Sequence, residues 1–164
     1  MRRWVKADPQ ALHHVMRNPA AMCYWSTLAH TDLALKEGWL ARSLVRDPAQ
    51  SAEFVIVLGD QIICIAGGNT LPEVGMILHP DHWGQGLASK TMRAVIAHIF
   101  TAFPFEHLTA DVDPRTAGSL TLLSRMRFVK TRAANATFLL GTQWCDMVYL
   151  TLTRDVWLQR SIGA

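Results

Sequence analysis

The feature that most limits the fold is a glycine-rich loop between an apolar run and a long amphipathic stretch. Residues 72–78 predict a strand, and His79-Pro80-Asp81 ends it. Apolar residues then recur at intervals of three and four over residues 87–103, which predicts a long helix with one face on a sheet. Gly84 and Gly86 lie in the short connection between them. This order favours a sheet that is covered by at least one helix.

The rest of the chain carries further helix and strand signals. The clearest is a hairpin, because Gly59-Asp60 separates two β-rich runs and glycine at the first central position favours a type II′ turn. The full order is β-α-α-β-β-β-α-β-α-β-β, which is a mixed α/β sheet with helices. The expected elements are an extended start at 1–5, helices over 8–16 (ended by Asn18-Pro19) and from Thr31 (with Leu33, Leu40 and Leu44 on one face), strands 54–58, 61–66 and 72–78, the helix 87–103, a strand at 108–112, a helix at 116–126, and a closing antiparallel pair at 128–140 and 144–152.

Length and composition predict one domain over residues 1–164. Of the 164 residues, 50% are hydrophobic and 18% are charged, so burial can offset the entropy cost of ordering the chain. No window reaches the roughly 18 uninterrupted apolar residues of a membrane helix, and the start of the chain does not resemble a signal peptide. We therefore expect a cytoplasmic protein without a membrane partner. Cys23, Cys64 and Cys145 are predicted to be reduced core thiols, because they show no CxxC spacing.

The charge pattern and the glycine loop together indicate an anionic ligand. The net charge is +3 and the pI is 9.0, but the basic residues form no tract that would bind nucleic acid. Glycines let the backbone approach a ligand, and free amides at a helix N-terminus favour phosphate, so we predict a pyrophosphate site. A Walker loop is excluded because Gly86-Leu-Ala-Ser-Lys-Thr91 lacks the glycine before its lysine, and Ser89 breaks a dinucleotide fingerprint. A strand-to-helix connection without a ligand is the alternative.

Several segments of the chain resemble the GNAT superfamily of acyl-CoA N-acetyltransferases, in particular its branch similar to ribosomal-protein-alanine N-acetyltransferases. The resemblance extends over nearly the whole chain and is most specific in the pyrophosphate loop. The matching segments are Arg3-Trp4 through Asn18-Pro19, Tyr24-Trp25-Ser26, Glu73-Val-Gly-Met-Ile-Leu78, Trp83-Gly-Gln-Gly-Leu-Ala88, Asp113-Pro-Arg-Thr-Ala-Gly-Ser119, Leu122-Leu-Ser-Arg-Met-Arg-Phe128, Gln143-Trp-Cys-Asp146 and Tyr149 through Trp157. The chain departs from the family pattern at Trp83, Thr116, Leu123 and Arg127.

This resemblance implies a GNAT-like fold and binding of acetyl-CoA as a co-substrate, without a metal. In the family one central strand splays away from the next, which leaves backbone groups free for the pantetheine arm and the thioester oxygen. The strand residues implied for this role are Met76, Ile77 and Leu78. The residues implied for the pyrophosphate are Trp83, Gly84, Gln85, Gly86, Leu87, Ala88 and Ser89, with Thr116 in the second motif.

Acetyl transfer to an amine also needs a group that removes the amine proton and a group that protonates the departing thiolate. Glu73 is the candidate base, because apolar neighbours at the start of its strand would raise its pKa. Glu53 and a water chain are alternatives, and either glutamate could instead be a solvated strand-end residue. Ser119, three residues after Thr116, is the candidate acid, with ordinary hydrogen bonding at the helix end as its alternative role.

Other patterns give no competing chemistry. His79-x-x-His82 has the residue types of a metal pair, but Pro80 and the loop setting favour a solvated turn, so no metal is expected. A cysteine acyl-enzyme is not expected either, because the cysteines have apolar neighbours or no activating partner. Trp25 and Trp39 could line an acceptor pocket or pack in the core.

We therefore predict an acetyl-CoA-dependent N-acetyltransferase that moves an acetyl group to a primary amine by direct transfer in a ternary complex. The sequence does not distinguish between a protein N-terminus, an aminoglycoside-like antibiotic, a polyamine and another small amine as the acceptor. It is also compatible with a homodimer. The alternative is an acyl-CoA-binding sensor or interaction module without turnover. This alternative is based on Thr116, Leu123 and Arg127, where the chain departs from the family pattern.

Overall fold

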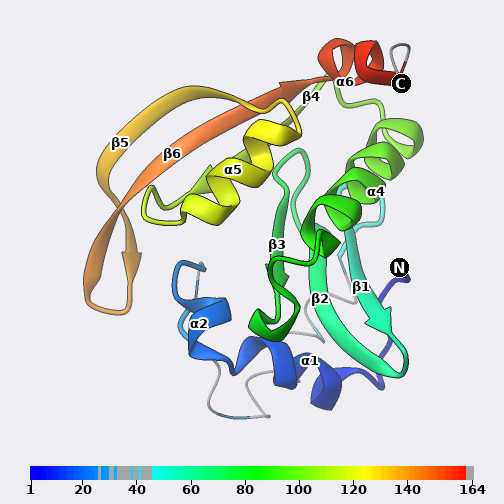
Figure 1. The fold of residues 1–164 in the computed structure, drawn as a ribbon, viewed down its shortest axis with the longest axis vertical. Coiled ribbons are helices and arrows are strands. Elements are labelled where there is room, and N and C mark those ends of the chain that lie inside the picture. Colours follow the sequence, from blue (N-terminus) through cyan, green and yellow to red (C-terminus); the bar gives the residue numbers. More distant parts are fainter. Residues whose placement is uncertain (26, 30–31, 33–37, 39–40, 42–45, 162–164) are drawn as a thin grey trace.

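The computed structural model describes residues 1–25, 27–29, 32, 38, 41 and 46–161 (Figure 1). The predicted helix that starts at Thr31, and Trp39 as a pocket residue, lie outside the described residues. The helices are α1 (Pro9–Met16), α2 (Pro19–Met22), the 3₁₀ helix η1 (Pro80–His82), α4 (Leu87–Ala102), α5 (Ala117–Arg125) and α6 (Arg154–Ser161). The strands are β1 (Ala52–Leu58), β2 (Gln61–Gly68), β3 (Gly75–Leu78), β4 (His107–Val112), β5 (Val129–Leu140) and β6 (Gln143–Thr153).

The strands form two three-stranded antiparallel sheets, with the orders β1-β2-β3 and β4-β6-β5. The β1–β2 hairpin is confirmed, and Gly59 at its turn has φ +58°, as a type II′ turn requires at that position. Among the described residues, a parallel bridge between Glu73 and Thr109 links the two sheets. The fold is thus the expected mixed α/β arrangement, with its sheet divided between β3 and β4.

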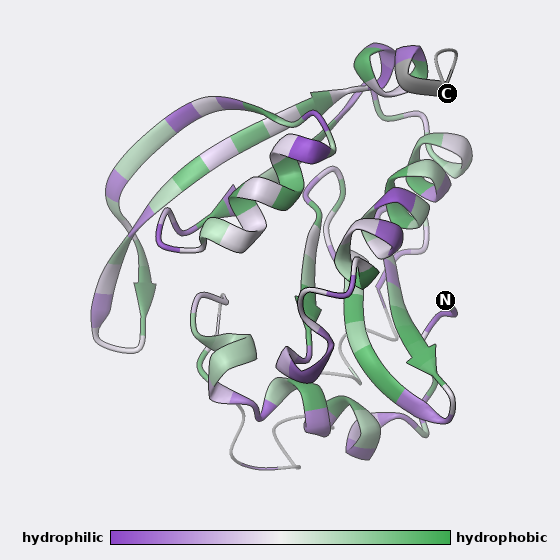
Figure 2. Ribbon diagram, viewed as in Figure 1, coloured by the Kyte–Doolittle hydropathy of each residue, from purple (hydrophilic) through white to green (hydrophobic). Residues whose placement is uncertain are grey.

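Apolar side chains cover both faces of the first sheet. One buried cluster joins this sheet to α4, α5 and the second sheet, and the other joins it to α1. Residues such as Val95, Ile96 and Ile99 belong to the first cluster, because a helical spacing of three and four places them on one face of α4. Figure 2 shows β1 and β2 as largely hydrophobic ribbons, as expected for strands buried on both sides.

Three local expectations were wrong or incomplete. The extended start contributes one bridge, between Arg2 and Val55, instead of a strand. Asn18 not only ends α1 but also caps α2, because its side chain accepts hydrogen bonds from the N–H groups of Ala20 and Ala21. Helix α6 directly continues β6 and was not expected. None of the helices in the described part of the chain is long and apolar enough to cross a membrane.

Helix α6 begins at Arg154, whose side chain binds backbone carbonyls at the end of α4. The guanidinium of Arg154 donates hydrogen bonds to three backbone carbonyls, those of Phe100, Phe103 and Phe105. The Phe100 carbonyl belongs to the last turn of α4, where carbonyl groups lack partners within the helix. Arg154 therefore joins the end of α4 to the second sheet.

Candidate active site

The two sheets separate at a defined point between β3 and β4. The Val74 N–H donates to the Thr109 carbonyl at 2.8 Å, and the Thr109 N–H donates to the Pro72 carbonyl at 2.9 Å. Beyond this pair β3 and β4 belong to different sheets and diverge, as Figure 1 shows. Because β3 is an edge strand there, one row of its backbone groups faces the gap.

The hydrogen-bond pattern identifies which residues of β3 face the gap. Val74 bonds toward β4, whereas the N–H of His79 bonds to the Ile63 carbonyl of β2 at 2.9 Å. Successive residues of a strand direct their backbone groups to opposite edges. Met76 and Leu78 therefore face the gap, while the backbone of Ile77 pairs with β2.

Trp83 ties the glycine loop to this strand. Its indole Nε1 donates to the Leu78 carbonyl at 2.8 Å, although 53% of the residue is exposed. The carbonyl of Leu78 is therefore engaged, and its N–H and both backbone groups of Met76 remain directed at the gap. This contact gives the tryptophan a role that the sequence did not reveal.

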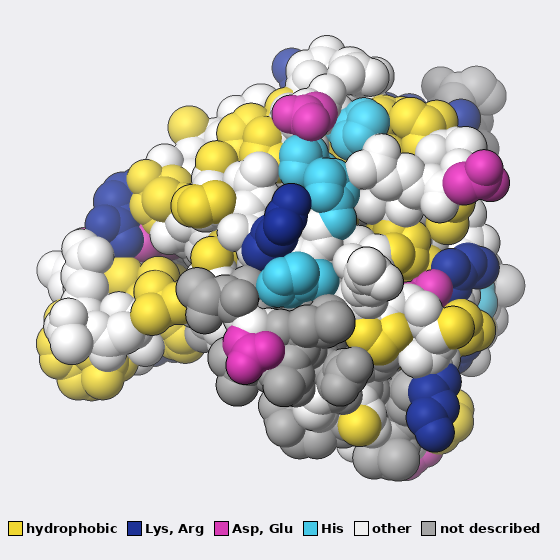
Figure 3. Space-filling model, turned by 90° about the horizontal axis from the view of Figure 1, so that it is seen from below, with side chains coloured by type: hydrophobic (Ala, Val, Ile, Leu, Met, Phe, Trp, Pro, Cys, Tyr) yellow, Lys and Arg dark blue, Asp and Glu magenta, His cyan; other side chains and the backbone are white. Residues whose placement is uncertain are grey.

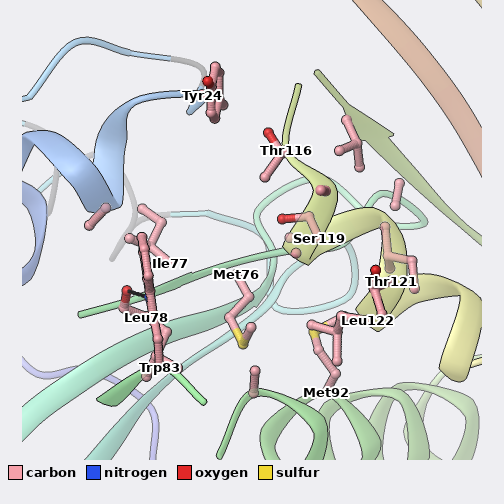
Figure 4. A pocket seen from close by; sticks show the side chains of 18 of the residues that line it. Tyr24, Met76, Ile77, Leu78, Trp83, Met92, Thr116, Ser119, Thr121 and Leu122 are labelled. Atoms are coloured by element: carbon pink, nitrogen blue, oxygen red, sulfur yellow. Dashed lines mark hydrogen bonds between the residues drawn. The ribbon is translucent and has the colours of Figure 1, made fainter. Parts of the chain in front are cut away.

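The gap opens into a cavity of about 840 Å³ (Figure 4). It is lined by β3, the glycine loop, the first turn of α4, the end of β4 and α5. Among the predicted residues, those that line it are Met76, Ile77, Leu78, Trp83, Gly84, Gly86, Leu87, Ala88, Ser89, Thr116 and Ser119. Gln85 is outside this lining, and its side-chain amide donates to the Asp81 carbonyl at 3.0 Å. Glu73 lies elsewhere, in the second cavity described below.

The loop at the start of α4 has the geometry of an anion cradle. Gly84 and Gly86 have φ values of +74° and +76°, which are readily adopted only by glycine, and no atom lies within 4 Å of a Cβ added at either position. Gly86 is the N-cap of a 16-residue helix with no acidic side chain in its first turn. The first N–H groups of α4 thus lack helical acceptors, and the positive end of the helix dipole adds to them.

The start of α5 adds polar groups to the opposite wall. Thr116 is the N-cap of α5, but its hydroxyl makes no cap hydrogen bond, and the buried Oγ1 has no partner. Figure 4 shows the hydroxyl groups of Thr116 and Ser119 on the side of α5 that faces the cavity. A buried oxygen without a partner costs free energy unless a ligand satisfies it. The cradle, the β3 edge and this oxygen together fit a pyrophosphate with an attached polar chain.

A second cavity, of about 300 Å³, lies on the other face of the sheets. Its floor contains Gly67, Gly68 and Gly75, and Trp25 lies so close over Gly75 that an added Cβ would be 2.9 Å from the indole Cη2. Phe138 and other side chains of β5 and β6 form an apolar wall. A Cβ at Gly67 or Gly68 would collide with the backbone carbonyl of Ala52 or Glu73, so these glycines let neighbouring backbone segments approach closely.

Carboxylates line this second cavity. Glu53 is half-buried, and desolvation raises its pKa to about 7, with Arg46 as an opposing charge. Glu73 is exposed at the rim, and desolvation, followed by repulsion from Asp111, raises its pKa. Desolvation also raises the pKa of Asp111, against the charge of Arg132. The cavity thus combines negative or proton-accepting groups with an apolar wall.

The two cavities meet. The residues that line both are Tyr24, Trp25, Val74, Gly75, Asp111 and Asp113. A molecule bound along the β3 edge would therefore reach a second molecule in the carboxylate cavity at this junction. Sequence reasoning missed Tyr24 and Asp111 as site residues, and only the alternation of Asp111 with the apolar residues of its strand hinted at its exposed face.

The cysteines and histidines do not add a reactive centre. All three thiols are free, but Cys23 is exposed, so its prediction as a core thiol was wrong, whereas Cys64 and Cys145 are buried. Burial raises the pKa of Cys64 to about 12. His79 is buried and stacks on His14 of α1 with ring centroids 4.4 Å apart. Figure 3, which views the molecule from below, shows histidine side chains gathered beside a basic side chain on this surface of the molecule. Desolvation, followed by repulsion from His14, lowers the pKa of His79. The described residues contain no group of three or more side chains that could hold a metal ion.

Comparison with known proteins identifies the family. The family model described as an acetyltransferase (GNAT) domain matches residues 1–129. The chain belongs to the GNAT acetyltransferase family. It is 25% identical to the uncharacterized N-acetyltransferase p20 of Bacillus licheniformis, over 79% of this chain and 78% of that protein. The GNAT match and this relative make the protein an N-acetyltransferase.

Solved structures share the GNAT fold. A spermidine N-acetyltransferase from Vibrio cholerae, in complex with CoA and spermine, superposes with a TM-score of 0.82 at 18% identity, and the match covers 96% of each chain. A ribosomal-protein-S5-alanine acetyltransferase from Vibrio fischeri superposes with a TM-score of 0.80 at 22% identity, over 95% of this chain and 93% of that one. At these identities the likeness shows the fold, including the predicted similarity to ribosomal-protein-alanine acetyltransferases.

Proposed function

We propose that this GNAT enzyme transfers the acetyl group of acetyl-CoA directly to a primary amine within a ternary complex. The observation that carries this proposal is the meeting of two chemically different cavities where β3 and β4 separate. One cavity offers free backbone groups and an anion cradle, and the other offers carboxylates. Both substrates can thus be held at once, so that no covalent acyl-enzyme is needed.

The residues of the first cavity are proposed to hold the CoA moiety. The amides at the start of α4, from Gly86 onward, would bind the pyrophosphate, while Trp83 fixes the loop on β3. The gap-facing backbone of Met76 and Leu78 would hold the pantetheine arm, and Thr116 Oγ1 would gain a partner. Acetyl-CoA supplies the activated acyl group, and an amide of β3 would polarise its carbonyl.

Glu73 is proposed to accept a proton from the ammonium group of the acceptor, so that the neutral amine can attack the thioester. Its carboxylate lies at the point where the sheets separate, beside Asp111, and its raised pKa makes it a stronger base than an ordinary glutamate. Glu53, in the same cavity, is the competing base. Ser119, on the opposite side of the junction, is proposed to donate a proton to the departing thiolate.

The second cavity supports a small cationic amine as acceptor. Glu53, Glu73 and Asp111 favour an ammonium ion, and the apolar wall suits an alkyl chain. A polyamine satisfies both conditions, and spermine is bound in the V. cholerae relative named above. An exposed protein N-terminus also carries an ammonium group, so it remains the second candidate acceptor.

A panel of amines tests the function. The chain should release CoA thiol from acetyl-CoA at a rate that rises with the concentration of at least one amine, and mass spectrometry should find that amine acetylated. The panel contains spermidine, an aminoglycoside and an alanyl peptide, with an N-acetylated peptide as the matched control. Initial rates should give intersecting lines, as expected for a ternary complex. Tight CoA binding without turnover on any amine would instead support the binding module.

A further inference from the structure

A cluster beside the cavity junction has no role in the reaction described so far. Asp113 is only 4% exposed, and its carboxylate accepts hydrogen bonds from the Nε and Nη2 atoms of Arg115. The same Nη2 donates to Cys145 Sγ on β6 at 3.4 Å. This double attachment fixes the plane of the guanidinium, which a lysine ammonium could not do.

The fixed guanidinium covers an aromatic ring. The Cζ atom of Arg115 lies 5.1 Å from the centroid of the Tyr24 ring, within the range of a cation–π contact. Tyr24 follows α2, which is in a different layer of the molecule from the start of α5. In Figure 4 the Tyr24 side chain stands across the cavity from Thr116. The contact therefore bridges the two sides of the cleft.

The bridge is located where the substrates would meet. Tyr24 and Asp113 line both cavities, and Arg115 lines the first. A ring held at this point narrows the path between the acceptor cavity and the β3 edge. It also occupies space through which water would reach a thioester held there.

We propose that Tyr24 is an acceptor-positioning residue, held over the junction of the two cavities by Arg115, and that its ring directs the amine to the acyl group in preference to water. This inference rests on the proposed function. The competing reaction is hydrolysis, in which the C–S bond of the thioester breaks, water supplies the new oxygen of acetate, one proton of the water goes to the CoA sulfur and the other goes to solvent. Loss of the ring should favour hydrolysis over transfer.

The kinetic test compares Tyr24→Ala with Tyr24→Phe. For the best amine of the panel, Tyr24→Ala should raise the amine KM roughly tenfold and the ratio of thiol released to amine acetylated severalfold, with the acetyl-CoA KM within about twofold of wild type. Tyr24→Phe keeps the ring and should behave like wild type. An unchanged amine KM and an unchanged ratio in Tyr24→Ala would overturn the proposal.

A second test needs no turnover. The chain has two tyrosines, and each ring faces an arginine, Tyr24 with Arg115 and Tyr149 with Arg132 at 3.8 Å. Protein labelled with 3-fluorotyrosine should give two fluorine resonances. Arg115→Lys should move the Tyr24 resonance and leave that of Tyr149, while Arg132→Lys should do the reverse.

The two tests fail in different ways. If the wild-type chain acetylates no amine, the proposed function fails, whereas the fluorine spectra still report whether Arg115 holds Tyr24. A Tyr24 resonance that does not respond to Arg115→Lys contradicts the bridge, whatever the activity. Arg115→Lys leaves Asp113 with a cationic neighbour, so the variant should fold. Thermal melting checks that it does.

Discussion

Glu53 and Glu73 line one cavity but differ in solvation. Glu53 lies half-buried on β1, and its pKa of about 7 is close to the value at which a carboxylate works best as a base at neutral pH. Glu73 is more exposed, but it stands at the bridge to Thr109, where the sheets separate. Solvation therefore favours Glu53 and position favours Glu73, so kinetics must separate them.

We expect Glu73→Gln to lower kcat by roughly 10²-fold or more and to leave CoA affinity nearly unchanged, since the carboxylate acts on the amine. Glu53→Gln is the matched variant, because it makes the same change in the same cavity. Rates are measured from pH 5.5 to 9. If Glu53 is the base, its variant will take the large loss and will lose the rise of kcat/KM with pH near 7. Near-normal turnover in both variants would transfer the role to water.

Ser119→Ala should lower kcat and kcat/KM together by about 10 to 10²-fold. The reason is that the hydroxyl would stabilise the departing thiolate in the transition state and would contribute little to binding of the substrates. The loss should be smaller than for the base, since a thiolate leaves readily and water can replace the hydroxyl. Ser124→Ala, on the same helix but outside the cavity lining, is the control. Melting curves must accompany the kinetics. Undiminished kcat in a stable variant would leave Ser119 as a structural residue.

At the scale of elements, the glycine loop should be sensitive to an added negative charge. Gly86→Asp should raise the CoA dissociation constant at least tenfold, about 1.4 kcal/mol, because a carboxylate would face the pyrophosphate. Gly59→Asp is matched in backbone strain, since Gly59 has φ +58° and also has open space around a Cβ, but it lies far along the chain in the β1–β2 turn. Calorimetry on both variants separates an effect at the loop from a general effect of the same substitution on the fold. Equal affinities would remove the loop from the cofactor site.

The elements were predictable where their signals are local. The hairpin at Gly59 and the helix after Gly86 depend on turn chemistry and on spacing, and both were found. Helix α6 was missed because a mostly polar run of residues after a strand carries no amphipathic period. The second cavity could not be predicted, because it requires residues from β1, β2 and β6 to meet beside Trp25. The same holds for Tyr24, whose arginine partner is distant in the sequence.

At the scale of the whole molecule, both proposed substrate sites depend on how the two sheets are joined. Val74 and Thr109 hold the sheets together at one end, and the β3 edge stays open beyond them. Two further contacts hold the layers around this opening: Arg154 joins α4 to the second sheet, and His79 joins the end of β3 to α1. These two further contacts lie outside both cavities, so variants of the cavity residues leave them unchanged.

Half-buried Glu53 and buried His79 should make stability depend on pH in opposite directions. The pKa of Glu53 is raised in the folded protein, so its contribution to stability is complete below about pH 4.5 and is lost as the pH rises through about 7. The pKa of His79 is lowered, so its contribution to stability is present above the ordinary histidine pKa of 6.5 and is lost as the pH falls.

Glu53→Gln should therefore raise the free energy of unfolding at pH 8 by up to about 3 kcal/mol and change it little at pH 4.5. His79→Gln should reduce the loss of stability on the acid side. Denaturant unfolding at pH 4.5, 6 and 8 measures both variants, and an offset for Glu53→Gln that is equal at all three pH values would show that its carboxylate is solvated in the folded chain.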